Sequence, residues 1–214
     1  MNDSPNLNSD VLFYRDLWRR RFRKPRPLTF QNGVLKNAYC PDCGFCCGPQ
    51  SETEPFLMAL LESQISARTA NDFYLLDRHT ASLDQRGCKS LGPAGCRLSQ
   101  ELRPVACNIF PVVLVQEGLY LYRICPAVTL NPKAELRAMA RSVQAWLNAL
   151  PQAAIRRIAI SRTAAELAGK YLDLRLRVQG SSCLPAAPAA EPAGSKDSPG
   201  PGVRAPLPFC HERR

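Results

Sequence analysis

The residues of this chain most able to do chemistry are its cysteines. Four of them fall in one short run, Cys40-Pro-Asp-Cys43-Gly-Phe-Cys46-Cys47. The others that precede the C-terminal tail are spaced more widely: Cys88, Cys96, Cys107 and Cys125. A Cys-x-x-Cys turn lets two sulfur atoms converge on one centre, and Gly44 permits the tight backbone that this needs. The pattern therefore predicts thiolate ligation of metal, either at two sites of four or at one site with some cysteines left over.

The spacing also indicates which metal binds. Cys-x-x-Cys-x-x-Cys opens a ferredoxin-type iron–sulfur run whose remaining ligand comes from a distant segment. Structural zinc more often uses two separated Cys-x-x-Cys pairs, and the later cysteines include no such pair. The sequence favours an iron–sulfur cluster, of the 4Fe–4S type, and zinc stays the alternative because no Cys-Pro ends the run. Since Cys46 and Cys47 are adjacent and project differently, we expect one of them to serve a second centre or to remain free.

Cysteines can also form disulfides or lie buried without a chemical role. Disulfides are typical of exported proteins, and the start of the chain, MNDSPNLNSDVLFYRD, has no basic region followed by an apolar stretch. No segment reaches the roughly 18 apolar residues of a membrane helix. We therefore expect a cytoplasmic protein with reduced thiols and no transmembrane segment. Inert buried cysteines would explain one or two positions but not the dense run.

Arg103 lies between Cys96 and Cys107, in the string Glu-Leu-Arg-Pro-Val-Ala-Cys-Asn-Ile-Phe-Pro. A tetrathiolate centre is anionic with either zinc or a four-iron cluster. An arginine beside it can donate hydrogen bonds to the sulfur atoms and offset their charge. The alternative is an ordinary surface arginine that precedes a turn proline.

Together these motifs resemble the YkgJ-type cysteine-cluster family. The matching segments are the run from Cys40 to Cys47, Gly87-Cys88, Gly95-Cys96, the Arg-Pro-x-x-Cys-x-x-Phe-Pro string from Arg103 to Pro111, and Cys125-Pro126. All eight family cysteines are present between residues 40 and 126, about two fifths of the chain, and Asn108 stands where a basic residue is common. The resemblance implies chelation of zinc or iron by these cysteines. It leaves the role open, because that of the family is largely undefined, although its members include flagellin lysine N-methylases in which the cluster lies within a larger enzyme.

Other catalytic signals are sparse. His79 is the one histidine before the C-terminal tail, and its neighbours lack metal-helix spacing. We expect a surface histidine, with a Cys–His nucleophile pair as the less supported alternative. The sequence has no glycine-rich phosphate loop and no dinucleotide fingerprint. Whether the protein is an enzyme therefore stays open, and no catalytic residue is assigned.

The formal net charge of +10 is concentrated near the N-terminus, where residues 15–26 hold seven arginines and lysines. The segment from Trp18 to Arg26 interleaves aromatic and positive side chains, which suits nucleic-acid binding or an anionic membrane surface. The favoured interpretation is a solvated, partly helical leader that packs its aromatic rings on the domain. The second functional hypothesis is a structural zinc protein whose basic N-terminus contacts nucleic acid or another anionic partner.

Several elements must position these residues. Apolar residues three to four apart predict a helix over residues 10–24, which Pro25 ends. The capping box from Ser51 to Glu54 predicts a helix over residues 55–65. Residues 88–111 are irregular, and residues 112–124 read as a β-hairpin with a turn at Gln-Glu-Gly.

The last part of the folded region looks helical. Residues 136–150 follow the helical period closely. A second helical region follows, broken near Ser161 and continued by the apolar face of Leu167, Tyr171 and Leu174. We expect an α+β fold that is mainly helical: a small irregular metal-nucleated domain with one β-hairpin and C-terminal helices.

Four segments are predicted along the chain. They are a basic N-terminal segment (1–30), a cysteine-cluster metal-binding domain (31–130), C-terminal helices packed on it (131–178) and a disordered tail rich in proline, glycine and alanine (179–214).

Overall fold

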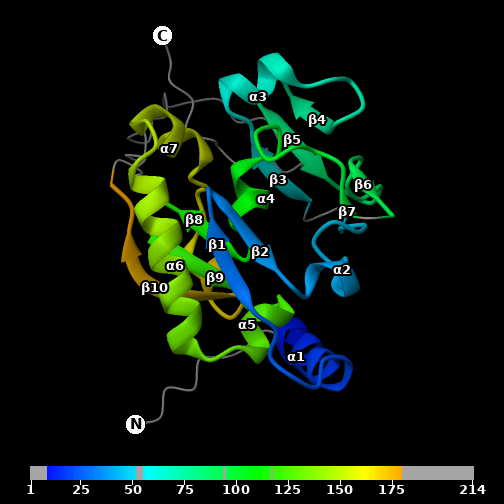
Figure 1. Ribbon diagram of the computed structural model, residues 1–214, viewed down its shortest axis with the longest axis vertical. Coiled ribbons are helices and arrows are strands. Elements are labelled where there is room, and N and C mark those ends of the chain that lie inside the picture. The colour runs from blue at the N-terminus through cyan, green and yellow to red at the C-terminus, as the bar shows by residue number, and fades with distance from the viewer. Residues whose placement is uncertain (1–8, 52–54, 94, 117, 180–214) are drawn as a thin grey trace, which may run out of the picture.

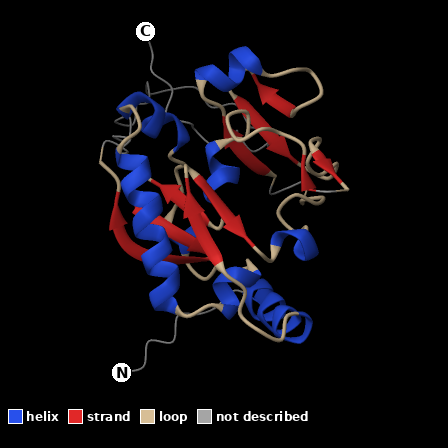
Figure 2. Ribbon diagram, viewed as in Figure 1, coloured by secondary structure: helices blue, strands red, loops and turns tan. Residues whose placement is uncertain are grey.

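The computed structural model describes residues 9–51, 55–93, 95–116 and 118–179. It is an α+β structure with 35% helix and 26% strand, in which the strands form four small sheets (Figure 2). The prediction of a mainly helical protein with one β-hairpin is therefore wrong. The predicted disordered tail, apart from residue 179, lies outside the described residues.

The main core forms around a three-stranded antiparallel sheet in the order β10-β9-β8. β8 (Val112–Val115) and β9 (Gly118–Tyr122) form the hairpin that the sequence predicts. The predicted helix over 136–150 is also confirmed, as α6 (Lys133–Asn148), which runs alongside this sheet (Figure 1). Its apolar stripe joins the same buried cluster as the strands: Leu136, Met139, Ala140, Val143 and Leu147.

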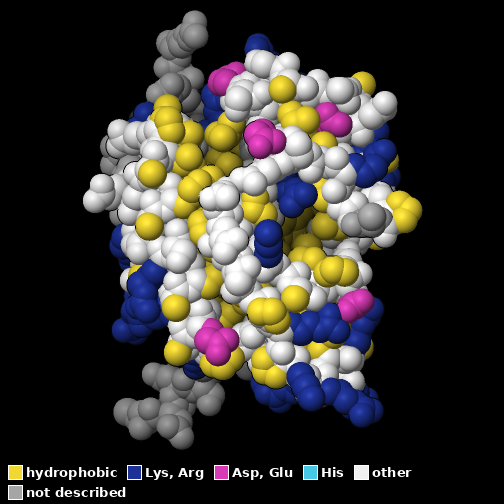
Figure 3. Space-filling view, in the orientation of Figure 1, with side chains coloured by type: hydrophobic (Ala, Val, Ile, Leu, Met, Phe, Trp, Pro, Cys, Tyr) yellow, Lys and Arg dark blue, Asp and Glu magenta, His cyan; other side chains and the backbone are white. Residues whose placement is uncertain are grey.

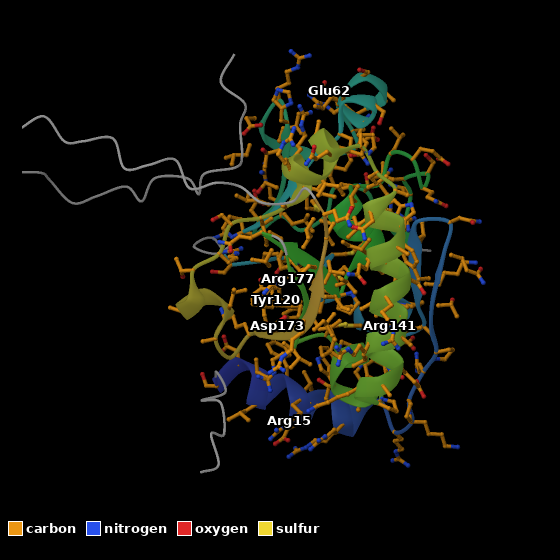
Figure 4. All side chains as sticks on the ribbon, turned by 90° about the vertical axis from the view of Figure 1, so that its left-hand side faces the viewer. Arg15, Glu62, Tyr120, Arg141, Asp173 and Arg177 are labelled. Carbon is orange, nitrogen blue, oxygen red and sulfur yellow. The ribbon has the colours of Figure 1, made fainter. Side chains whose placement is uncertain are left out.

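The expected continuation of helix to Leu174 is wrong. After α7 (Gln152–Ile158) and α8 (Ala164–Leu167), residues 171–177 form β10 (Tyr171–Arg177), which pairs antiparallel with β9. The sequence Tyr-Leu-Asp-Leu-Arg-Leu-Arg alternates apolar and polar residues, which is the period of a strand. β9 offers it a free edge, and Figure 4 shows Tyr120, Asp173 and Arg177 side by side along the pair.

A second sheet has the order β3-β5-β4. Its strands are β3 (Phe56–Ala59), β4 (Tyr74–Asp77) and β5 (Thr80–Leu83), and α3 (Glu62–Ala67) follows β3. The helix predicted over 55–65 is thus wrong in its first half. The apolar run Phe-Leu-Met-Ala-Leu-Leu suits either a strand or a buried helix, and pairing with β5 decides the outcome. Residues 52–54 of the expected capping box lie outside the described residues.

Two short hairpins complete the strands. β1 (Leu28–Gln31) and β2 (Val34–Asn37) meet at Asn32-Gly33, where both residues have positive φ, as a type I′ turn requires. In the region predicted to be irregular, β6 (Leu91–Gly92) pairs with β7 (Gly95–Cys96). The remaining helices are short: α2 (Cys40–Cys43), α4 (Val105–Ile109) and α5 (Pro126–Leu130).

The predicted N-terminal helix is confirmed as α1 (Ser9–Arg21). The two aromatic side chains of the basic stretch face inward, because Trp18 is 2% exposed and Phe22, just beyond the helix, is 4% exposed. Their rings are therefore not available for stacking on bases, whereas the arginines of the last turn stay exposed. Among the described residues, none of the helices has both the length and the apolar character needed to cross a bilayer.

Candidate metal centre

The first cysteines lie on one turn of helix. α2 begins after Tyr39 with Pro41 in its first turn, and its C-terminal cap is Gly44, which has φ +62°. The backbone N–H of Gly44 donates to the carbonyl oxygen of Cys40 at 3.2 Å, and that of Cys43 donates to Tyr39 at 2.9 Å. The expected role of Gly44 in the tight backbone is thereby confirmed, since this left-handed conformation favours glycine.

The chain then turns back on itself so that the next two cysteines stay near the first two. The backbone N–H groups of Cys47 and Gly48 donate to the carbonyl oxygen of Gly44 at 3.2 and 2.8 Å. The side chain of Gln50 donates to the carbonyl oxygens of Phe45 and Gly48 at 2.9 and 3.0 Å. These bonds hold a compact loop with Cys46 and Cys47 at its centre.

A cysteine from far along the chain joins this loop. Cys40, Cys43, Cys46 and Cys47 line a cavity of about 40 Å³ together with Cys125. A single water needs about 10–15 Å³ by the same kind of measure, so the cavity exceeds one water. The other lining residues supply mainly apolar and backbone surface: Asn37, Tyr39, Gly44, Phe45, Phe110 and Pro126.

Asn37 ties Cys125 to the start of α2. Its side-chain oxygen accepts a hydrogen bond from the backbone N–H of Tyr39 at 3.0 Å, and its Nδ2 donates to the Sγ of Cys125 at 3.8 Å. Cys125 is buried in a cluster with Trp18 and Tyr39, directly before α5. No sequence motif marks Asn37 as a neighbour of the cysteines.

The three remaining cysteines, Cys88, Cys96 and Cys107, do not line this cavity. The backbone N–H of Cys88 donates to the carbonyl oxygen of Cys47 at 2.8 Å. Leu91, three residues after Cys88, pairs with Cys96 between β6 and β7. Cys107 lies in α4, where its Sγ is 3.1 Å from the Sδ of Met58. Met58, 49 residues away, is another neighbour that no sequence signal indicates.

Figure 3 shows a hollow on this face between β2 and β7, floored by side chains of the hydrophobic class, which includes cysteine. Lysine or arginine side chains lie at its margin. The side chains of Cys96 and Cys107 keep exposed surface. The protein atoms packed around the Cys107 thiol nevertheless raise its pKa.

Among the cysteines that line the cavity, all except Cys47 have a raised pKa, which favours the neutral thiol when no cation is near. Burial, with the neighbouring thiols adding to it, raises the pKa of Cys125 to about 12 and that of Cys40 to about 11. The side chains of Cys46 and Cys47 hydrogen-bond each other, which raises the pKa of Cys46 and lowers that of Cys47 to about 7. A bound cation reverses this preference, because a coordinating thiol is deprotonated.

Arg103 lies beside the thiols, as the sequence suggested. Its positive charge lowers the pKa of Cys40 and Cys107 against the stronger effect of burial, and at Cys47 it adds to the lowering of the pKa by the hydrogen bond with Cys46. One guanidinium nitrogen donates to the carbonyl oxygen of Leu98 at 3.3 Å. Its Nε is buried and has no hydrogen-bond partner among the described residues. This leaves a donor ready for an acceptor such as a thiolate sulfur.

The cysteine thiols are suitable donors for a metal, but their side chains are not arranged as a metal site in this structure. In the described ranges, no group of three or more His, Cys, Asp or Glu side chains is arranged to hold a metal ion. The backbone nevertheless brings the cysteines together, so ligation requires Sγ atoms to turn between staggered rotamers. All eight described cysteines are free thiols, and such soft donors suit zinc and iron–sulfur clusters.

The structure separates His79 from this group. It follows β4, and its Nδ1 lies 3.9 Å from a carboxylate oxygen of Glu62. A larger hollow of about 550 Å³ lies nearby, next to α3 and β4. The described residues that line it include Arg68, Tyr74 and Arg86 but no Cys, His, Asp or Glu, so it does not offer a metal site.

Comparison of the chain with known proteins finds no matching family model, no matching curated protein and no matching solved structure. The resemblance to the cysteine-cluster family therefore depends on the motif residues alone.

Proposed function

We propose that this protein binds metal through thiolates of residues 40–125 and holds an iron–sulfur cluster, with zinc as the alternative metal. The observation that carries the proposal is the cavity shared by Cys40, Cys43, Cys46, Cys47 and Cys125. The last of these is separated from the others by about 80 residues of sequence, yet the fold returns it to the same cavity. Four thiolates from one run and one distant position are what a ferredoxin-type centre uses.

The surroundings of these cysteines support this role. The thiol of Cys125 is buried and costly to ionise, and a bound cation would supply the compensating charge. Asn37 already donates to the Sγ of Cys125, which is the kind of contact that orients a metal ligand. We propose a cytoplasmic location, because a reducing compartment keeps such thiols free.

Metal binding would also stabilise the fold. It would link α2 to the start of α5 across the cluster of Trp18, Tyr39 and Cys125. In small zinc domains such linkage contributes on the order of 10 kcal/mol of folding free energy. The metal then supplies cohesion to a segment whose own helix, α2, is only one turn long.

Metal analysis of protein purified without oxygen tests the proposal. A cluster predicts iron and a broad absorbance near about 400 nm, whereas colourless protein with stoichiometric zinc supports the alternative metal. Cys43→Ser should lose metal, and Cys183→Ser, outside the described residues, should keep it. Well-folded protein that contains neither iron nor zinc would overturn the proposal.

A further inference from the structure

Helix α1 carries apolar side chains on two opposite sides. One side packs on the domain, where Val11 and Trp18 are 4% and 2% exposed. The other side faces outward and holds Leu12, Phe13 and Leu17, which are 39%, 64% and 38% exposed. A helix that only has to pack on the domain needs a single apolar face. The outward apolar side chains of α1 therefore call for a separate explanation.

These outward side chains form a group. Among the described residues, six large apolar side chains are markedly exposed, and half of them lie within residues 12–17. Phe13 and Leu17 are one turn apart on the same side of the helix. Single exposed apolar residues are ordinary on protein surfaces, whereas a group of them is typical of a surface that binds a partner or a membrane.

Positive side chains gather next to this group. Residues 9–26 hold seven arginines and lysines against two aspartates. Arg21 and Arg26 are committed to the domain, because both donate to oxygen atoms of Asp42. The exposed side chains that have no hydrogen-bond or ion-pair partner within the described part of the chain are Arg19, Arg20, Arg23 and Lys24. Figure 3 shows Lys and Arg side chains crowded at the lower right, where Figure 1 places α1.

From this arrangement we propose that α1 docks the protein on a lipid bilayer with anionic headgroups. Leu12, Phe13 and Leu17 enter the boundary between headgroups and acyl chains, and the free arginines and lysine contact the lipid phosphates. Helices that lie on membranes combine these two features, because apolar burial and attraction to anionic lipid add to each other. This inference goes beyond the proposed function and does not depend on metal binding.

The side chains around the positive charge favour lipid over nucleic acid. Proteins that bind single strands stack bases on aromatic rings, but Trp18 and Phe22 are turned inward. Contacts to a duplex are made mainly by charged and polar side chains, which would leave Phe13 and Leu17 in water. Arg20 follows Phe13 by seven residues and so lies on the same side of the helix. A bilayer accepts both the apolar and the positive side chains of this side.

The inner side of α1 holds the helix in place for this contact. The ring of Tyr14 lies 4.7 Å from that of Phe45, and the ring of Trp18 lies 5.8 Å from that of Phe22. Since α1 is already folded and packed on the domain, docking does not bear the entropy cost of ordering a disordered segment.

Sedimentation of the full chain with lipid vesicles tests the proposal. We expect binding to vesicles that contain phosphatidylglycerol, much weaker binding to pure phosphatidylcholine, and weaker binding at about 1 M salt, where charges are screened beyond about 3 Å. Arg19→Gln with Arg20→Gln should lower the partition coefficient about 10–30-fold. Phe13→Gln with Leu17→Gln should lower it about 10-fold or more. A wild-type chain that ignores phosphatidylglycerol, or that binds both kinds of vesicle equally, overturns the proposal.

Two matched pairs make the same changes away from α1. Arg137→Gln with Arg141→Gln removes two exposed arginines from α6, and Leu75→Gln with Leu76→Gln removes two exposed apolar side chains from β4. We expect both pairs to bind vesicles as the wild type does. If either pair weakens binding as much as its counterpart on α1, general surface properties and not this helix drive the binding, and the inference fails.

A fluorescence measurement covers the case in which a paired variant does not fold. Phe13→Trp places an indole at the most exposed apolar position of α1. On phosphatidylglycerol vesicles we expect its emission, compared with that of the wild-type chain, to move to shorter wavelength and to be quenched by brominated lipid. Unchanged emission overturns the proposal. A gel shift of DNA without vesicle binding would assign the surface to nucleic acid instead, and self-association that Phe13→Gln with Leu17→Gln abolishes would assign it to a second copy of the chain.

Discussion

The indole Nε1 of Trp18 donates a hydrogen bond of 2.6 Å to the carbonyl oxygen of Ile124, the residue before Cys125. The two residues are 106 positions apart, so this bond connects the N-terminal helix directly to the last cysteine of the candidate site. It gives α1 a structural role in holding Cys125 in place.

We therefore expect Trp18→Phe to lower the free energy of unfolding by about 1–3 kcal/mol, because the carbonyl oxygen of Ile124 loses its buried donor. Trp18→Ala should cost about 3–5 kcal/mol through the cavity that it adds. Urea unfolding measures both. Phe13→Ala is the control on the same helix, since Phe13 is 64% exposed and should change stability by no more than about 0.5 kcal/mol. Equal losses for Phe13→Ala and Trp18→Ala would contradict the buttressing role.

Gly87→Ala should separate Cys88 from the loop that carries Cys46 and Cys47. The new Cβ would press on backbone atoms of Cys47 and Gly48, which cannot move aside as a flexible side chain can. We expect less metal per chain and a lower melting temperature. Gly95→Ala is the matched control. Gly87 and Gly95 both have positive φ, but a Cβ added at Gly95 meets no atom within 4 Å. It carries the backbone strain of about 1–2 kcal/mol without the clash. If both variants lose the same amount of metal, the close approach at Gly87 is not what matters.

Arg103→Gln should weaken metal binding by the cysteines of residues 40–125. The change removes a positive charge beside thiolate ligands, and loss of such an outer partner typically lowers metal affinity about 10–100-fold. Competition with a chelator of known affinity measures the change. Arg97→Gln provides the control, because Arg97 is exposed and uses its guanidinium to donate to the carbonyl oxygen of Lys89 at 2.8 Å. Unchanged affinity in Arg103→Gln would show that Arg103 only braces the loop.

Gln64 is a buried polar side chain that secures the segment carrying Arg103. Its Oε1 accepts from the backbone N–H of Leu61 at 2.9 Å, and its Nε2 donates to the carbonyl oxygens of Glu101 and Arg103 at 3.3 and 2.8 Å. Gln64→Ala removes these bonds, although the carbonyl oxygen of Arg103 keeps the one from Asn108 at 3.2 Å, and should cost about 1–3 kcal/mol in denaturant unfolding. Ser63→Ala, at the exposed neighbouring position, should be close to neutral. A neutral Gln64→Ala would mean that water replaces these bonds.

Asp84 should make stability depend on acid pH. The guanidinium and backbone N–H of Arg86 donate to its carboxylate and lower the pKa of Asp84 to about 2. Because the folded pKa lies below the unfolded one, near about 4, the stabilisation is present above pH 4 and is lost as the pH falls to about 2. Asp84→Asn should thus be less stable than wild type at neutral pH, and the difference should shrink through this range. Asp16→Asn, at an exposed position of α1, matches the change in charge. A difference that stays constant down to pH 2 would argue against the pair.

Local sequence determined the elements that depend on near neighbours. The 3.6-residue period specified α6, the turn residues and apolar runs specified the β8–β9 hairpin, and Gly44 marked the end of the turn that carries Cys40 and Cys43. Local pattern predicted the wrong element where a short apolar segment suits either a helix or a strand. β3 and β10 are strands because they pair with β5 and β9. The residues of a short segment do not show which distant strand the segment will pair with.

The cysteines show the same division between local and distant information. Their types and spacing by themselves indicated metal chemistry and identified the eight candidate thiols, since those properties belong to consecutive residues. Only the tertiary structure decided that Cys125 shares a cavity with Cys40, whereas Cys88 lies against Cys47. That choice depends on hydrogen bonds and packing between segments up to 106 residues apart, among them the bond from Trp18 to Ile124, and such contacts form only when the chain folds.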